Sequence, residues 1–170
     1  MKIDDVKRIL VVGAGQMGAQ IAMQSALHGY AITLNDLTMD VLQKGMGGNR
    51  KQLERRVQKG QMTKDQMEEA LARVRLEADL EKAARDADFV IEAIVERLEP
   101  KKECFARLDR FCPPHAILAT NSSTLMNSQI APSTKRPDKC VNMHYFFPPL
   151  VMKLVEVVKG QATSEETVEI

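Results

Sequence analysis

The chain has 170 residues, a formal net charge of +1, and 44% apolar and 28% charged residues, an ordinary composition for one globular domain. The small net charge argues against a general affinity for nucleic acid or membranes, and no apolar run is long enough to span a bilayer. The first ten residues contain two aspartates and no long apolar core, unlike a secretory signal. Three cysteines without metal-site spacing predict a reducing, cytoplasmic location and neither disulfides nor a metal.

Strand and helix patterns alternate along the chain. A β-branched run at 9–12 is followed by glycines and by helical spacing that ends at Gly29. A second strand is expected at 31–36, then a long basic helix at 38–59 weakened by Gly47 and Gly48, and a helix from a capping box at Thr63 and Gln66 to Arg73. Further strands are expected at 74–77, 88–94, 116–120, 139–147 and 152–158, with helices at 80–87 (capped by Asp79) and 101–111, and a helix start at Thr163 or Ser164. This order predicts a doubly wound, mainly parallel α/β sheet with a helical hairpin inserted after its second strand.

The first strand-to-helix turn carries Gly13, Gly15 and Gly18 in the spacing G-x-G-x-x-G. Such glycines allow a tight turn, let the backbone approach a pyrophosphate, and let the helix pack closely on the strand. Asp36 ends the second strand, where a carboxylate can accept both adenosine ribose hydroxyls and repel a 2′-phosphate. The pattern predicts a Rossmann-type domain that binds NAD rather than NADP, with Gln16 and Met17 also at the cofactor. A structural alternative for Asp36 is a cap of the following helix.

The segment MHYFFPPLVMKLVEVV at 143–158 is almost wholly apolar but contains His144 and Glu156, twelve residues apart. A buried carboxylate needs a partner, and a histidine beside a carboxylate is a common general base. The alternative is a core histidine and an unrelated glutamate at an edge.

Four ordered segments then resemble the N-terminal domain of the 3-hydroxyacyl-CoA dehydrogenases, including the 3-hydroxybutyryl-CoA dehydrogenases. They are VVGAGQMGAQIA, DFVIEAIVERLEPKKECFARLD, ATNSSTL and MHYFFPPLVMKLVEVV. The resemblance implies NAD-linked interconversion of an L-3-hydroxyacyl-CoA and its 3-ketoacyl-CoA, with an acyl-CoA as substrate.

The same resemblance implies roles for individual residues. His144 and Glu156 match the family's catalytic pair, and Ser123 matches its active-site serine, which can donate to the substrate or to the nicotinamide ribose. The alternative for Ser123 is an ordinary Ser/Thr turn. Asn121 lies in the same loop. Glu96 and Lys101 match positions near the nicotinamide ribose; without the family match they read as a helix-start ion pair that contributes little. Lys59 matches a contact to the CoA nucleotide, whereas Arg55 and Arg56 are expected to form a solvated basic face.

Two departures from the family pattern stand out. The family usually reads F-F-N-P after the histidine, and here Phe147 occupies the asparagine's position, which bears on the nicotinamide and substrate geometry. The final segment GQATSEETVEI reads as a helix start that is cut off at Ile170. We expect residues 1–170 to be a NAD-binding domain without the family's helical domain, monomeric and poorly active alone, from a parent that forms a homodimer.

Two rival functions stay open at this stage. One is a dehydrogenase of the same architecture that acts on a free 3-hydroxy acid or a sugar nucleotide. The other is a non-catalytic NAD-binding or structural protein that keeps the fold.

Overall fold

The computed structural model describes residues 2–170, and its strands form one seven-stranded sheet within that range. The sheet order is β3-β2-β1-β4-β5-β6-β7, in which all neighbours are parallel except β6 and β7. The strands are β1 (Arg8–Val12), β2 (Ala31–Asn35), β3 (Val74–Glu77), β4 (Phe89–Glu92), β5 (Ile117–Thr120), β6 (Cys140–Tyr145) and β7 (Val155–Lys159). The predicted fold class, a mainly parallel Rossmann-type sheet, is confirmed.

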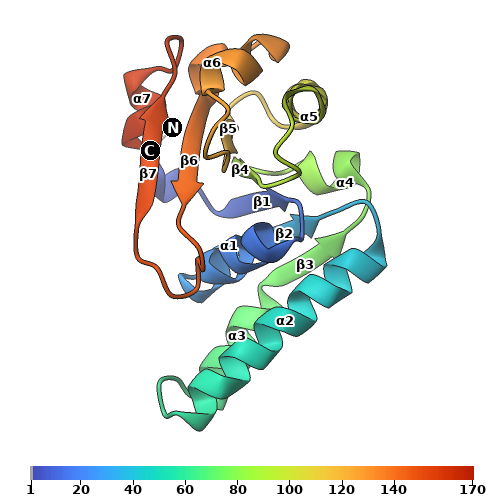
Figure 1. Cartoon of the computed structure of the whole chain (residues 1–170), viewed down its shortest axis with the longest axis vertical. Coiled ribbons are helices and arrows are strands. Elements are labelled where there is room, and N and C mark those ends of the chain that lie inside the picture. Colours follow the sequence, from blue (N-terminus) through green and yellow to red (C-terminus); the bar gives the residue numbers. More distant parts are fainter. Residues whose placement is uncertain (1) are drawn as a thin grey trace.

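Helices follow most strands, as the alternating pattern predicts. They are α1 (Gln16–Leu27), α2 (Met39–Gln58), α3 (Lys64–Ala72), α4 (Leu80–Ala84), α5 (Leu98–Phe111), α6 (Asn127–Ile130) and α7 (Glu165–Glu169). Figure 1 shows α2 and α3 as an antiparallel hairpin that projects away from the sheet, after β2 as expected. The chain order reverses between β1 and β4, and at such a switch point the loops diverge and open a crevice for ligands.

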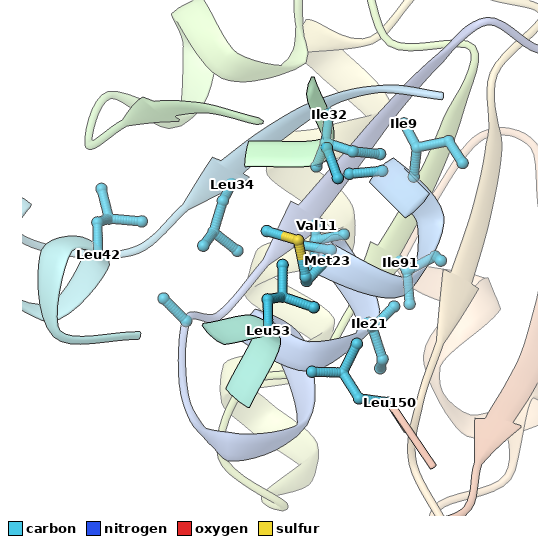
Figure 2. Close-up of a cluster of buried hydrophobic side chains, with 14 of the residues drawn as sticks. Ile9, Val11, Ile21, Met23, Ile32, Leu34, Leu42, Leu53, Ile91 and Leu150 are labelled. Carbon is cyan, nitrogen blue, oxygen red and sulfur yellow. The ribbon is translucent and has the colours of Figure 1, made fainter. Parts of the chain in front are cut away.

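Alternating side chains explain how the two faces of the sheet are covered. Ile9 and Val11 pack with α1, α2 and α3 in one buried cluster, part of which Figure 2 shows, whereas Leu10 and Val12 pack with α4 and α5 on the opposite face. Because successive residues of a strand point to opposite faces, β1 must be apolar throughout when both faces are covered.

Helix starts agree closely with the sequence signals. Thr38, Thr63, Asp79 and Ser164 are the N-caps of α2, α3, α4 and α7, and Thr63 forms the predicted capping box with Gln66.

Gly47 and Gly48, which are expected to weaken the long helix, do not interrupt it. Helix α2 is continuous from Met39 to Gln58. A Cβ at either glycine would meet nothing within 4 Å, whereas one at Gly45 would lie 2.7 Å from the Ala14 carbonyl oxygen. Gly45 is therefore the glycine that close packing requires.

Candidate active site

The three glycines of the turn between β1 and α1 have different structural roles. Gly13 has φ +102°, and a Cβ there would lie 2.6 Å from the carbonyl oxygen of Ala93. A Cβ at Gly18 would lie 1.8 Å from the carbonyl oxygen of Gly13. Gly15, the N-cap of α1, is exposed and has no atom within 4 Å of an added Cβ. Open space over a helix N-terminus is what a pyrophosphate needs, so the turn fits a dinucleotide.

Asp36 lies directly beside this turn. Its Oδ2 accepts a hydrogen bond from the Ala14 N–H at 2.6 Å and its Oδ1 accepts one from the Leu37 N–H at 2.7 Å. Thr38, not Asp36, caps α2. The carboxylate is half-buried, which leaves it partly accessible at the end of β2, where the ribose of a dinucleotide is expected.

His144 and Glu156 form a pair across the β6–β7 hairpin. The two residues are opposite each other in the antiparallel register, and the His144 Nδ1 lies 2.9 Å from the Glu156 Oε2. The register explains the twelve-residue spacing. The His144 side chain is 23% exposed and that of Glu156 54%, so the carboxylate is not buried as its apolar context implied. The His144 ring also packs against Phe146, with ring centroids 4.9 Å apart.

Several predicted residues line one cavity of about 340 Å³ near the carboxyl ends of β4, β5 and β6. They are Met17, Glu96, Lys101, Asn121, Ser123, His144 and Phe147. Ser123 and His144 also line an adjacent cavity of about 340 Å³, which extends past Glu156. The fold thus brings residues from five separate segments to one place, with His144 and Ser123 between two cavities.

Sequence reasoning missed the group that organises one wall of the first cavity. Glu92, at the end of β4, is completely buried and accepts hydrogen bonds from Lys101 Nζ, Ile94 N–H and Thr120 Oγ1, each at 2.7 Å. The helix-start ion pair of Lys101 with Glu96 is present at 3.2 Å, but Lys101 is only 1% exposed, so it is not a weak surface pair. A charge inside an apolar strand was the available signal, since buried charges are expected to be paired.

Glu96 connects this buried pair to the cavity. Its Oε2 lies 3.2 Å from Lys101 Nζ, and its Oε1 accepts hydrogen bonds from the hydroxyls of Ser122 and Thr124. Partial burial raises the pKa of Glu96, but the Ser122 hydroxyl and the Lys101 charge outweigh it and hold that pKa at about 2. Ser122, which the sequence analysis passed over, therefore fixes Glu96, while its neighbour Ser123 is exposed.

Asn121 holds the end of β6 where the loop of the β6–β7 hairpin begins. Its Oδ1 accepts a hydrogen bond from the Tyr145 N–H at 2.9 Å, directly after His144. Phe147 lines the cavity and is 57% exposed, so an apolar ring stands where the family resemblance leads one to expect an amide.

Lys59 does not join this group. It is the C-cap of α2, exposed at the tip of the helical hairpin (Figure 1). Arg55 is exposed too, but Arg56 donates a hydrogen bond to the carbonyl of Leu150 and so ties the hairpin to the segment after β6. The expectation that both arginines belong to a solvated face is therefore wrong for Arg56.

The cysteines are remote from this chemistry. Cys104, Cys112 and Cys140 are free and buried, and burial raises the pKa of each thiol, to about 12, 12 and 11. Across residues 2–170, no cluster of three or more histidine, cysteine or acidic side chains could hold a metal ion, and no helix is long and apolar enough to cross a membrane.

Comparison with known proteins identifies the family. The model of the 3-hydroxyacyl-CoA dehydrogenase NAD-binding domain matches residues 8–170. The chain belongs to this family. NAD is accordingly its cofactor, in agreement with the open turn at Gly15 and with the position of Asp36.

Individual relatives agree with this assignment. The chain is 44% identical to a probable 3-hydroxybutyryl-CoA dehydrogenase of Bacillus subtilis, over 96% of this chain and 56% of the relative. It is 39% identical to the human mitochondrial hydroxyacyl-coenzyme A dehydrogenase, over 96% of this chain and 54% of the relative. The crystal structure of 3-hydroxybutyryl-CoA dehydrogenase from Escherichia coli K12 superposes with a TM-score of 0.94 at 42% identity, covering 96% of this chain and 34% of that chain. The chain thus spans about half the length of the first two relatives.

Proposed function

We propose that the chain is the NAD-binding part of an enzyme that interconverts L-3-hydroxyacyl-CoA and 3-ketoacyl-CoA, with His144 as the acid–base group. One observation carries the proposal. The imidazole that pairs with Glu156 at 2.9 Å lines the same cavity as Met17, Glu96 and Ser123, beside a fold that binds NAD. This arrangement supports a site in which the proton-transfer group stands beside the hydride acceptor.

The chemistry requires both transfers. NAD, when bound, supplies the acceptor for the hydride that leaves the carbinol carbon. The Nε2 of His144 takes the hydroxyl proton, because Nδ1 is engaged by Glu156, and returns the proton to the carbonyl oxygen in the reverse reaction. Glu156 stabilises the imidazolium and holds one tautomer. Ser123, exposed between the two cavities, donates to the substrate oxygen or to the nicotinamide ribose.

The proposed ligand contacts are supported by the site's geometry and, for Lys59, by the family resemblance alone. The turn Gly13–Gly18, with Gln16 and Met17, holds the pyrophosphate, Asp36 binds the adenosine ribose, and Glu96 accepts from the nicotinamide ribose. Lys101 acts on the cofactor through Glu96, because its ammonium is already engaged by protein oxygens. Lys59 binds the CoA nucleotide at the hairpin tip.

The decisive assay follows NADH oxidation with two substrates. Acetoacetyl-CoA should support turnover, and free acetoacetate at the same concentration should support far less. A preference for the free acid would favour the first rival function, a dehydrogenase of free 3-hydroxy acids. Tight NADH binding without turnover of either substrate, in a protein as long as its relatives, would favour the non-catalytic rival.

The surface supports a further part of the proposal. Val151, Met152, Leu154, Val157 and Val158 are 43–65% exposed. Exposed apolar surface can mark a contact region, and the relatives are about twice as long as this chain. We propose that a helical domain covers part of this exposed apolar segment in a cytoplasmic, homodimeric enzyme, and that residues 1–170 alone are monomeric. Sedimentation of residues 1–170 as a tight dimer at micromolar concentration would contradict this.

A further inference from the structure

Glu92, Lys101 and Glu96 form a continuous group of charges, here called the charged triad, at the wall of the cavity that Met17 and His144 also line. The Lys101 ammonium lies 2.7 Å from Glu92 Oε1, 3.2 Å from Glu96 Oε2 and 3.5 Å from the carbonyl oxygen of Ile94. An ammonium has three N–H donors. All three are therefore directed to protein oxygens, and Lys101 has none left for a ligand.

The triad carries two carboxylates and one ammonium, so its formal charge is −1. The Glu92 carboxylate is the acceptor in each of its hydrogen bonds, and the donors are Lys101 Nζ, the Ile94 N–H and Thr120 Oγ1. An ionised carboxylate can only accept hydrogen bonds, so this pattern fits the charged form. Glu96 is held ionised by its own hydroxyl donors and by Lys101. Two other titratable groups line this cavity: Tyr145, whose pKa burial raises to about 12, and His144, which is neutral when it acts as a base.

Stability does not explain this arrangement. Lys101 and Glu92 are 1% and 0% exposed, and burying such a pair costs desolvation energy that its attraction often fails to recover. A single buried carboxylate would balance Lys101. The second carboxylate, Glu96, is 41% exposed and turns a neutral pair into a negative wall at the cavity. Excess negative charge at a ligand cavity indicates that the ligand carries a positive charge there.

We infer that the charged triad makes the cavity prefer the cationic nicotinamide of NAD⁺ over the neutral ring of NADH, and that Glu92 is a positioning residue that sets this preference through Lys101 and Glu96. The inference rests on the proposed function, in which the nicotinamide occupies this cavity. A site that binds NAD⁺ more tightly than NADH makes the bound NADH a stronger hydride donor, because the transfer leaves the favoured oxidised form. The triad therefore favours reduction of a 3-ketoacyl substrate by bound cofactor.

The test measures dissociation constants of NAD⁺ and NADH by calorimetry, without any turnover. In Glu92→Gln the amide can still accept from Lys101 and Ile94 N–H and still bond Thr120, while the triad becomes neutral. We expect the ratio of the NAD⁺ constant to the NADH constant to rise about tenfold, the scale of one charge acting across several ångströms in a protein. Glu96→Gln, at a partly exposed position that tolerates an amide, should raise the ratio in the same direction and serves if Glu92→Gln does not fold.

Two controls separate charge from shape. Glu99→Gln removes one negative charge from the same helix, but at a side chain that is 80% exposed, so the ratio should stay unchanged. Thr120→Val removes a hydrogen bond from Glu92 without changing charge and should alter both constants by the same factor.

The outcomes distinguish the inference from the function on which it rests. A raised ratio in Glu92→Gln and Glu96→Gln supports the inference. An unchanged ratio, or an equal loss of both affinities in the two variants, overturns it while leaving NAD binding intact. If the folded wild-type chain binds neither NAD⁺ nor NADH, the proposed function fails and the inference fails with it.

Discussion

Strand β4 carries a buried carboxylate at each end, and the two do different things. Asp88 precedes the strand and is 5% exposed, and Glu92 ends it and is 0% exposed. Asp88 accepts hydrogen bonds from the N–H groups of Lys7 and Arg8, and its Oδ1 contacts Arg8 Nη2 and His115 Nε2 at 3.1 Å. Glu92 instead holds Lys101, which reaches the cavity through Glu96.

Burial alone therefore does not separate a structural carboxylate from a functional one. The partners do. The donors to Asp88 join the start of β1 to the loop before β5, so the hydrogen bonds of this carboxylate stabilise the fold. At the carboxyl ends of the strands the polar groups are left facing open space, as ligand sites in open α/β sheets require. Changes at the carboxyl ends should impair binding and catalysis, and a change at Asp88 should impair stability alone.

The largest combined effect on cofactor binding and stability is expected at Gly18, in the first turn of α1. In Gly18→Ala the new Cβ would lie 1.8 Å from the carbonyl oxygen of Gly13, so the turn must move. A displacement on that scale should weaken NADH binding by about 10²-fold or more and lower the free energy of unfolding by about 3 kcal/mol. Titration with NADH and urea denaturation measure the two effects.

Gly47→Ala is the matched control for Gly18→Ala. Its Cβ would meet nothing within 4 Å, so it should keep NADH affinity and gain up to about 1 kcal/mol of stability, because alanine favours a helix over glycine. Normal NADH binding by Gly18→Ala would mean that the turn does not position the cofactor.

The second prediction separates catalysis from binding at His144. His144→Gln should lower kcat by about 10²–10⁴-fold, as expected for loss of a general acid–base group, with NADH affinity and unfolding free energy nearly unchanged. The measurement is steady-state turnover of acetoacetyl-CoA by a protein of the relatives' length. Wild-type turnover by a folded His144→Gln enzyme would remove the catalytic assignment.

Glu156→Gln tests whether the pair acts as a unit. It should also lower kcat, because a neutral partner stabilises the imidazolium poorly. The double variant should be little slower than His144→Gln alone. Additive losses would mean that Glu156 acts on its own, without His144.

The sequence predicted backbone features more fully than side-chain networks. The glycine turn, the hairpin after β2 and the caps at Thr63 and Asp79 all depend on residues close in the chain. Local signals of this kind are carried by a few neighbouring residues, so they can be recognised from one sequence.

The charged triad could not be predicted in the same way. Glu92 and Lys101 are nine residues apart, but Thr120 is 28 residues from Glu92 and becomes its partner only because β4 and β5 pair in register. Likewise, the exposure of Glu156 depends on β7 being an edge strand, whereas the apolar sequence around it indicates burial. The partner of Glu92 and the exposure of Glu156 both depend on the pairing of strands that are distant in the sequence. A family resemblance indicates which residues matter but not which contacts they make.

The third prediction tests the amino end of β4. Although burial raises the pKa of Asp88, its hydrogen bonds from Arg8 and from two backbone N–H groups hold that pKa well below its usual range. A depressed carboxyl pKa adds stability that is present above the unfolded pKa of about 4 and is lost as the pH falls below it. Asp88→Asn should therefore lower the free energy of unfolding by about 2 kcal/mol at pH 7, and the gap to wild type should narrow steadily as the pH falls from about 4 towards 2.

Urea denaturation at several pH values measures this difference in unfolding free energy. NADH titration at pH 7 tests whether a change at the amino end of β4, unlike changes at the carboxyl ends of the strands, leaves cofactor binding intact. Asp88→Asn should bind NADH normally, since Asp88 lies at the opposite end of the strand from the crevice. A loss of NADH affinity without a loss of stability would contradict the division between the two ends.

The smallest expected effect concerns Asp36, a carboxylate at the carboxyl end of β2 that discriminates between cofactors. Because it would face a 2′-phosphate, NADPH should bind at least about tenfold more weakly than NADH, a difference of about 1.4 kcal/mol. Asp36→Ser should narrow that gap by admitting the phosphate, while NADH affinity falls through loss of the ribose contacts. Asp40→Ser is the matched control, since it removes the same charge from an exposed position in the first turn of α2 and should leave the gap intact. Fluorescence titration of both reduced cofactors measures all three proteins. Equal affinities of the wild type for NADH and NADPH would show that Asp36, like Asp88, serves only the fold, through its bonds to Ala14 and Leu37.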